Sequence, residues 1–333
     1  MSVATLTVRK IKAFLEKKFS HAPDESADND TQEASRRGVI ENFYRAGEIE
    51  KLKEIAEHDV YSPAEASRAL GVLALDRIAK LAEKSEPQAN GTITSRTLPD
   101  SRGGTRKYTL YLPPGYENSK ERYPVVYLLH GMMTPVNSPM GPMSSDEYWR
   151  NKLKVAKLID RLIDTGAINR AVFVMPDMGA IPIRSDGRNE EFITKDLIPH
   201  IDQTYRTMPD RNHRAIDGYS LGARLSVGIA TRNPDKFSSV SGHSGIYHGM
   251  DPKKTKGLHF YFSASRWDPL STAKSNRMVK KIRSDDGDVV YDKHAILKFS
   301  PPTPMHTYEM WRRGLEMSFI YHSMNFKRAE QKK

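Results

Sequence analysis

The sequence predicts an α/β fold in which a mostly parallel central sheet carries helices on both faces, preceded by a small helical region. From about residue 90 onward, short β-branched and apolar segments alternate with segments of helical periodicity. This βαβ rhythm is typical of parallel sheets. Before that point the chain shows helical patterns only. A chain of 333 residues can hold one large α/β core and a modest appendage.

The composition excludes several classes of protein. There is no run of 18 or more apolar residues and no apolar signal-peptide core behind the first Met, so we expect no membrane span and a cytoplasmic location. With no cysteine, a nucleophile must be Ser, Thr, Lys or a carboxylate. The net charge of +11 is spread along the chain without a nucleic-acid-binding motif. We therefore interpret it as surface charge and expect no nucleic-acid partner.

Residues 1–88 are predicted to form a helical appendage without a catalytic motif. Residues 5–19 carry an apolar stripe opposite basic residues, which fits a helix packed on its own protein or one that binds a membrane surface or a partner. Residues around 20–36 are acidic and poor in large apolar side chains, which predicts a disordered linker. Two further helices follow, the second opened by the capping sequence SPAE. A homo-oligomer or protein-partner interface is one role for this appendage.

The main domain is predicted to span residues 89–326, followed by a basic tail at 327–333. It opens with an antiparallel hairpin around a glycine-rich turn, with Tyr108, Leu110 and Leu112 on one face. The continuous apolar run YPVVYLL suits a strand that is buried on both faces. The other expected strands are AVFVM, RAID, SSVSG, LHFYFS and AILKF.

Helices are expected between these strands. Residues 146–165 form one helical stretch. In EEFITKDLIPHIDQTY, an apolar residue recurs every four positions, at Ile193, Leu197, Ile201 and Tyr205, which places these side chains on one helix face. Two more helices are expected near the C-terminal end of the domain.

The segment GYSLG fits the pattern G-x-S-x-G of a nucleophile elbow. It follows a predicted strand directly and opens a predicted helix. In such a sharp turn, a side chain at Gly218 or Gly222 would clash, and the serine is lifted into a strained, exposed position. A serine between two glycines is more often an ordinary turn, so the strand-turn-helix context carries the interpretation. Ser220 is the predicted nucleophile.

A serine hydroxyl needs a histidine to accept its proton and a carboxylate to orient that histidine. Where the serine lies on such an elbow, the chain order is serine, acid, histidine. Asp268 lies just past a predicted strand, and His306 lies between the last predicted strand and the last helix. Asp285, Asp286 and Asp288 sit in a polar turn and are most simply solvated. Asp268 and His306 are therefore the predicted partners of the serine.

The tetrahedral intermediate of acyl transfer needs two backbone N–H donors at its oxyanion. Leu221, directly after the nucleophile, supplies one by position, and Met132 in LLHGMM is the expected source of the other. The candidate substrate-binding residues are His130, His243 and Trp267. For His130, the alternative is a simple turn with Gly131, and for His243 it is a loop histidine satisfied by the backbone.

An ordered set of motifs resembles the esterase D family of α/β-hydrolases: YTLYLPPGY, YPVVYLLHG, FVMPD, FITKDLIPHIDQTYRT, RAIDGYSLGA, RNPDKFSSVSGHSG, WDPL and HTYEMW. The family includes feruloyl and other carbohydrate esterases, enterochelin-type esterases, S-formylglutathione hydrolases and mycolyltransferases. The resemblance covers residues 90–324 and implies an α/β-hydrolase fold. It also implies a role for five residues: Ser220, Asp268 and His306 in the catalytic triad, and Met132 and Leu221 in the oxyanion hole.

The chain departs from this family pattern around its histidine. Many members carry two glycines before the catalytic histidine and a tryptophan two residues after it, where this chain has Pro304, Met305 and Tyr308. This predicts a stiffer or differently aimed loop. The short connection between SGHSG and LHFYFS predicts an open groove rather than a site under a large cap.

We therefore expect a serine hydrolase that cleaves a carboxylic ester or thioester of a small acylated molecule through an acyl-enzyme, with no metal or organic cofactor. Two alternatives stay open at this point. An acyltransferase would use the same triad with an alcohol or amine acceptor. A non-catalytic binding protein would keep the hydrolase fold without its chemistry.

Overall fold

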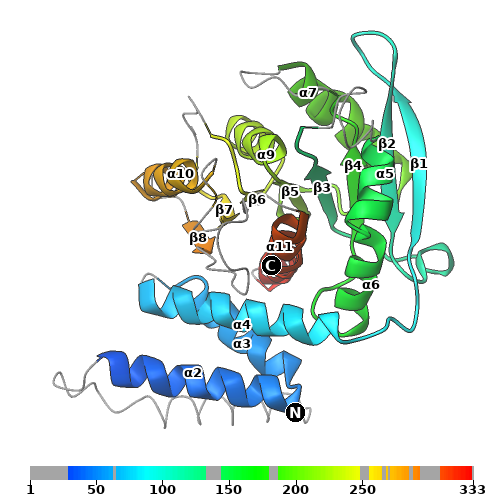
Figure 1. The fold of residues 1–333 in the computed structure, drawn as a ribbon. Helices are drawn as coiled ribbons and strands as arrows, with labels where there is room; N and C mark the ends of the chain where they lie inside the picture. The colour runs from blue at the N-terminus through cyan, green and yellow to red at the C-terminus, as the bar shows by residue number, and fades with distance from the viewer. Residues whose placement is uncertain are drawn as a thin grey trace.

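In the computed structural model, a mixed sheet of eight strands forms the centre of the part of the chain that is described (Figure 1). The structure describes residues 29–62, 65–132, 144–179, 187–247, 255–264, 268, 271–284, 288–292 and 308–331. The strands are β1 (Thr92–Pro99), β2 (Thr105–Leu112), β3 (Val125–Leu129), β4 (Val172–Pro176), β5 (Arg214–Gly218), β6 (Ser239–His243), β7 (His259–Ser263) and β8 (Asp288–Asp292).

The strand order is β1-β2-β4-β3-β5-β6-β7-β8. The hairpin β1–β2 is antiparallel and joins β4 in antiparallel fashion, whereas every later pair is parallel. The predicted opening hairpin and parallel sheet are thus confirmed. The carboxyl ends of the parallel strands share one edge, where loops can bring side chains from several strands together.

Helices cover both faces of the sheet. One face carries α6 (Val155–Asp164) and α11 (Tyr308–Glu330), and the other carries α8 (Ile198–Thr204), α9 (Leu221–Arg232) and α10 (Thr272–Ser284). Alternate residues of the apolar strand β3 enter the two separate hydrophobic clusters on these faces. A continuous apolar run was therefore the correct signal for a strand buried on both sides.

Two predicted helices are interrupted. The stretch at 146–165 consists of α5 (Ser145–Glu147), a π-helical turn to Lys152, and α6, with Lys154 in the left-handed region at φ 49° between them. A π-helical segment likewise joins α7 (Gly187–Glu191) to α8. The apolar faces are nevertheless as predicted, because the hydrophobic side chains of these segments are buried.

The N-terminal helices form a third layer on the α11 face. They are α2 (Asn29–Ala46), α3 (Ile49–Asp59) and α4 (Glu65–Glu83), and Figure 1 shows α4 crossing beneath α11 and the end of α6. Residues of α3 and α4 belong to the same hydrophobic cluster as residues of α6, α11 and the sheet. The predicted appendage therefore shares the core of the main domain.

The predicted linker at 20–36 is wrong from residue 29 onward, where α2 begins. Two ion pairs explain the difference. Arg37 binds Glu33 one turn earlier at 2.6 Å, and Arg36 binds the buried carboxylate of Asp59 on α3 at 2.5 Å. The second contact joins residues far apart in sequence, so composition alone could not reveal it.

Two further expectations need correction near the C-terminal end. The predicted tail at 327–333 is helical as far as Glu330, because α11 continues and Arg328 packs over the Tyr61 ring at 4.2 Å. The predicted strand AILKF lies outside the described residues, whereas DVVYD forms β8. Asp288, expected in a turn, opens this strand; its side chain is 39 % exposed, as expected for a solvated group, and accepts a hydrogen bond from His259 at 2.7 Å.

Polar contacts also join α4 to α11. Arg313 donates to the backbone carbonyl of Asp76 at 2.8 Å and to its carboxylate, and it lies 3.1 Å from a Glu316 carboxylate oxygen. Burial alone would raise the pKa of Asp76, but Arg313 and Lys80 outweigh it and lower that pKa to about 2. Burial raises the pKa of Glu316 to about 7 in spite of Arg313.

Glu316 makes the free energy of unfolding depend on pH. Its folded-state pKa of about 7 exceeds the ordinary value of 4.5, so between these values the native state binds more protons than the unfolded chain. The stability contributed by this group is therefore present below pH 4.5 and is lost as the pH rises through 7.

We expect Glu316→Gln, which cannot ionise, to lose less stability over this range than the wild type. Thermal unfolding at about pH 5, 6 and 8 tests this, and parallel profiles would contradict it.

Candidate active site

Ser220 lies in the sharp turn between β5 and α9, as predicted. Its φ of 54° and ψ of −119° are strained for a residue with a side chain. A Cβ on Gly218 would overlap the carbonyl group of Gly222, and a Cβ on Gly222 would overlap the carbonyl oxygen of Leu129. The two glycines flanking the serine are therefore required by close packing of backbone on backbone, for the reason that the sequence indicated.

The backbone on both sides of the turn holds Ser220 in place. Its N–H donates to the carbonyl of His243, at the end of β6, at 2.8 Å. Ser220 lies at the carboxyl edge of the sheet and precedes the first turn of α9, but it is 6 % exposed, so the strain is as predicted and the exposure is not. The helix N-terminus adds a positive partial charge at this point.

The two predicted oxyanion positions both lie beside Ser220. Leu221 is the first residue of α9, where backbone N–H groups have no partner within the helix. The segment after β3 passes directly against the serine, since a Cβ on Gly131 would lie 3.0 Å from the Ser220 Cβ. Met132 follows at once, with its side chain 71 % exposed.

His130, one of the candidate substrate-binding residues, makes its contacts within the fold. It is fully buried, its Nε2 accepts the N–H of Met178 at 2.9 Å, and its Nδ1 lies 2.6 Å from the carbonyl oxygen of Gly131. The Nε2 atom therefore carries no proton and Nδ1 is the donor. His130 ties the segment after β3 to the segment after β4 and thereby fixes the backbone that precedes Met132.

His243, the second candidate, is likewise buried. Its Nε2 lies 2.9 Å from the carboxylate of Asp217, and its Nδ1 lies 2.7 Å from the Ser263 hydroxyl. These contacts join the ends of β5, β6 and β7. The side chain thus fixes the strand end whose carbonyl accepts the Ser220 N–H.

The last helix completes this buried polar network. Ser318 donates to the Asp217 carboxylate at 2.5 Å, and His322 lies 3.4 Å from the same oxygen and 2.6 Å from the Ser239 hydroxyl. Burial would raise the pKa of Asp217, but His243 and His322 outweigh it and hold that pKa below its ordinary range. The sequence analysis missed Asp217, although a carboxylate inside the apolar strand RAIDG was the available signal.

Asp268 lies at the same edge of the sheet, past the end of β7. Its side chain is buried, and its carboxylate accepts a hydrogen bond from Ser271 at 2.5 Å. Its backbone carbonyl accepts from Thr272 at the start of α10. The other predicted partner, His306, lies outside the described residues, as does Trp267.

The start of α11 lies against the nucleophile turn. The Trp311 ring stacks on the Tyr219 ring with centroids 4.4 Å apart, and Tyr219 directly precedes Ser220. A Cβ on Gly314 would lie 2.5 Å from the His243 Nδ1, so the helix packs closely on β6. His306 stands two residues before the first residue of α11 in the chain.

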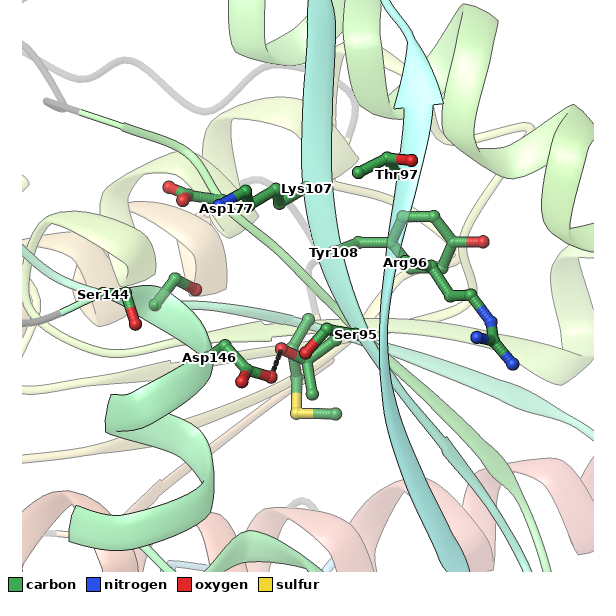
Figure 2. A pocket seen from close by; sticks show the side chains of 11 residues that line it. Ser95, Arg96, Thr97, Lys107, Tyr108, Ser144, Asp146 and Asp177 are labelled. Carbon is green, nitrogen blue, oxygen red and sulfur yellow. Dashed lines mark hydrogen bonds between the residues drawn. The ribbon is translucent and has the colours of Figure 1, made fainter.

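A polar hollow of about 500 Å³ opens at the same edge, between the β1–β2 hairpin and the start of α5 (Figure 2). Lys107 lines it from β2, Asp177 from the position directly after β4, and Asp146 from α5. The Asp146 carboxylate accepts hydrogen bonds from Thr109 and Arg150, each at 2.8 Å. Burial would raise the pKa of Asp146, but Arg150 and the neighbouring hydroxyls outweigh it and lower that pKa.

In the described ranges, no group of three His, Asp or Glu side chains is placed to hold a metal ion. None of the helices described there combines the length and the apolar character needed to cross a bilayer.

A strained serine between a strand and a helix, at the carboxyl edge of a mostly parallel sheet with helices on both faces, defines an α/β-hydrolase fold. Residues 100–294 match the family model described as Putative esterase. The chain belongs to this esterase family. The helices α2 to α4 and α11 lie outside the matched segment.

Similar proteins include enzymes named for feruloyl esters. An endo-1,4-β-xylanase/feruloyl esterase of Xylanibacter ruminicola is 27 % identical over 236 residues, 65 % of this chain and 29 % of that protein. An esterase of Mycobacterium tuberculosis is 31 % identical over 142 residues, 40 % of this chain and 28 % of that protein. This chain therefore spans less than a third of either relative. The structure of a ferulic acid esterase from Anaeromyces mucronatus matches with a TM-score of 0.60 and 17 % identity, over 73 % of this chain and 94 % of that one.

Removing the carboxylate of Asp217 is expected to destabilise the fold. In Asp217→Ala, buried His243, His322 and Ser318 lose their shared partner, and we expect a loss of about 3 to 5 kcal/mol in the free energy of unfolding. Urea unfolding measures it. Asp235→Ala removes an exposed carboxylate and serves as the matched control. A similarly small effect of both substitutions would contradict the role given to Asp217.

Proposed function

We propose that this protein is a serine esterase that hydrolyses a carboxylic ester or thioester through an acyl-enzyme on Ser220. The observation that carries the proposal is the strained turn at Ser220, which lies at the start of α9 and packs against Gly131 of the segment after β3. Such strain costs about 1 to 3 kcal/mol and is typical of functional positions. The proposal assigns the Ser220 hydroxyl as the nucleophile and the backbone N–H groups of Leu221 and Met132 as the oxyanion donors.

In the proposed reaction, the Ser220 Oγ attacks the ester carbonyl while His306 accepts the hydroxyl proton. The N–H groups of Leu221 and Met132 donate to the oxyanion of the tetrahedral intermediate. His306 then gives its proton to the leaving alcohol or thiol, and an acyl-enzyme remains. Water, deprotonated by the same histidine, attacks the acyl carbon and releases the acid and the free serine.

Asp268 is the proposed partner of His306. The buried carboxylate lies on a strand-end segment at the same edge as Ser220, and Ser271 already donates to one of its oxygens. A carboxylate in this place would hold the histidine tautomer and stabilise the imidazolium. The stacking of Trp311 on Tyr219 supports the position of His306, because it brings the start of α11 to the residue before the nucleophile.

We also propose an apolar or aromatic acyl group and a polar leaving group. Met132 is an exposed, large apolar residue, and it directly follows Gly131, whose backbone packs on Ser220. The hollow near Asp146 and Lys107 is lined mainly by polar and charged side chains, which suits a hydroxyl-bearing alcohol (Figure 2). A feruloyl ester of a sugar combines both properties, and such esters give several relatives their names. We therefore propose this substrate class.

Ser220→Ala is expected to lower hydrolysis of p-nitrophenyl acetate and butyrate at least about a thousandfold, because it removes the proposed nucleophile. Release of p-nitrophenol measures the rate, and circular dichroism shows whether both proteins are folded. Ser284→Ala, at the end of α10, is the matched control. Unchanged hydrolysis by Ser220→Ala would reject the proposal. Product analysis with added alcohols distinguishes hydrolysis from acyl transfer.

Met132→Ala is expected to lower kcat/KM for methyl ferulate by roughly tenfold, the effect of removing most of one apolar side chain from contact with the acyl group. Hydrolysis of p-nitrophenyl acetate should change little, because the backbone N–H at position 132 is kept and the acetyl group is too small to reach the side chain. Equal losses with both esters would show that the substitution disturbs the oxyanion position instead of acyl recognition.

A further inference from the structure

Residues 243–246, which we call the β6 turn, bind both backbone polar groups of Ser220. The carbonyl of His243 accepts the Ser220 N–H at 2.8 Å, and the N–H of Ile246 donates to the Ser220 carbonyl at 3.4 Å. Tyr219 and His243 also form a parallel bridge beyond the end of β5. The conformation of Ser220 is therefore held by the position of the neighbouring turn.

The β6 turn is itself strained. Ser244 has a φ of 48°, which is unfavourable for a residue with a side chain. Its N–H donates to the carbonyl of Ser263 on β7 at 2.8 Å. A Cβ on Gly245 would overlap the Tyr247 ring, so the chain also packs tightly on this ring. Strain of this kind persists only where the surrounding contacts over-determine the backbone.

The side chain of His243 connects the β6 turn to three other elements through both ring nitrogens. Its Nδ1 lies 2.7 Å from the Ser263 hydroxyl on β7. Its Nε2 lies 2.9 Å from the Asp217 carboxylate on β5 and 3.2 Å from the Ser318 hydroxyl on α11. The imidazole is buried, where polar contacts are stronger than in water. The residue whose carbonyl binds the Ser220 N–H is thus fixed on both sides of its ring.

A second histidine binds the same carboxylate from another part of the network. His322 on α11 is equally buried and lies 3.4 Å from the Asp217 carboxylate. It contacts β6 at the hydroxyls of Ser239 and Ser241, at 2.6 Å and 3.1 Å, and both residues precede the β6 turn. Ser239 is the first residue of β6, at the opposite end of the strand from His243. The two histidines therefore share a partner but support different ends of β6.

We propose that His243 is a positioning residue for the nucleophile. Its carbonyl holds the Ser220 N–H, and its imidazole fixes that carbonyl, so the serine hydroxyl keeps the orientation in which it attacks the ester carbon. An error of about 1 Å in the place of a reacting group can lower a rate about a hundredfold. His243 acts through the backbone and touches no reacting atom. This inference rests on the proposed function, since it requires Ser220 to be the nucleophile.

The test makes the same substitution at the two histidines. His243→Ala removes the imidazole and keeps the backbone carbonyl that binds Ser220. His322→Ala removes an imidazole from the same Asp217 carboxylate and is the matched control. His243→Gln restores a side-chain N–H near the position of Nε2 and tests rescue. The full-length proteins are assayed well below their unfolding temperatures, with p-nitrophenyl butyrate and with a fluorophosphonate probe that labels reactive serines.

We expect His243→Ala to lower kcat and the rate of labelling by roughly tenfold to a hundredfold, because the Ser220 hydroxyl loses its fixed orientation. KM should stay within about twofold, since the substitution leaves the substrate contacts in place. His243→Gln should recover most of kcat. His322→Ala should lower the unfolding temperature as His243→Ala does and keep the wild-type kcat.

A milder pair of substitutions serves if the alanine variants do not fold. Ser263→Ala removes the hydroxyl that contacts His243, and Ser239→Ala removes the hydroxyl that contacts His322. Only Ser263→Ala should lower kcat.

A wild-type kcat in His243→Ala would overturn the proposal, and so would equal losses of kcat in His243→Ala and His322→Ala. The same two outcomes in Ser263→Ala and Ser239→Ala would overturn it as well. Ser220→Ala separates this failure from failure of the proposed function. If Ser220→Ala keeps wild-type hydrolysis, or if the wild type neither hydrolyses esters nor reacts with the probe, the proposed function fails and the inference fails with it.

Discussion

The buried carboxylate of Asp217 is the group on which the arrangement of the site depends. It lies three residues before Ser220 and contacts His243 on β6 and Ser318 and His322 on α11. An ionised carboxylate without such partners would be too costly to bury. Because its partners come from a neighbouring strand and from the last helix, the carboxylate joins the strand of the nucleophile to both. A shift of either element would leave a buried charge unpaired, and the network therefore favours one arrangement of β5, β6 and α11.

The same network explains how the chain maintains a strained serine. The backbone at Ser220 is unfavourable in isolation, but its N–H is bound by the carbonyl of His243, whose side chain Asp217 fixes from the adjacent strand. On the other side, Gly131 packs on Ser220, and His130 holds the carbonyl of that glycine. His130 and His243, the two candidate substrate-binding histidines, thus stabilise the backbone on either side of Ser220. Because these two histidines make their hydrogen bonds within the fold, the reaction proposed above uses only the Ser220 hydroxyl and the backbone N–H groups of Leu221 and Met132 from this part of the chain.

The features that could be predicted from the sequence are those that depend on residues close together in the chain. The hairpin, the apolar strand Val125–Leu129 and the turn at Ser220 each follow from a local pattern of apolar residues and glycines. The roles of His130 and His243 could not be predicted, because burial is decided by partners distant in the chain, Met178 and Asp217. The start of α2 and the strand β8 were missed for a related reason, since polar residues there bind groups on other elements.

Distance along the chain also separates the two halves of the proposed catalytic apparatus. The serine turn lies inside the segment that matches the esterase family, whereas α11 and the helices that cover it lie beyond its two ends. Apolar residues of α4 and α11 share one cluster, so removing the N-terminal layer would expose the outer side of α11 to water. Without that layer, α11 would be packed only on the face where Trp311 stacks on Tyr219. The N-terminal helices are for this reason an integral part of the hydrolase domain in this chain, joined to it by core packing and by the partly buried ion pair of Asp76 with Arg313.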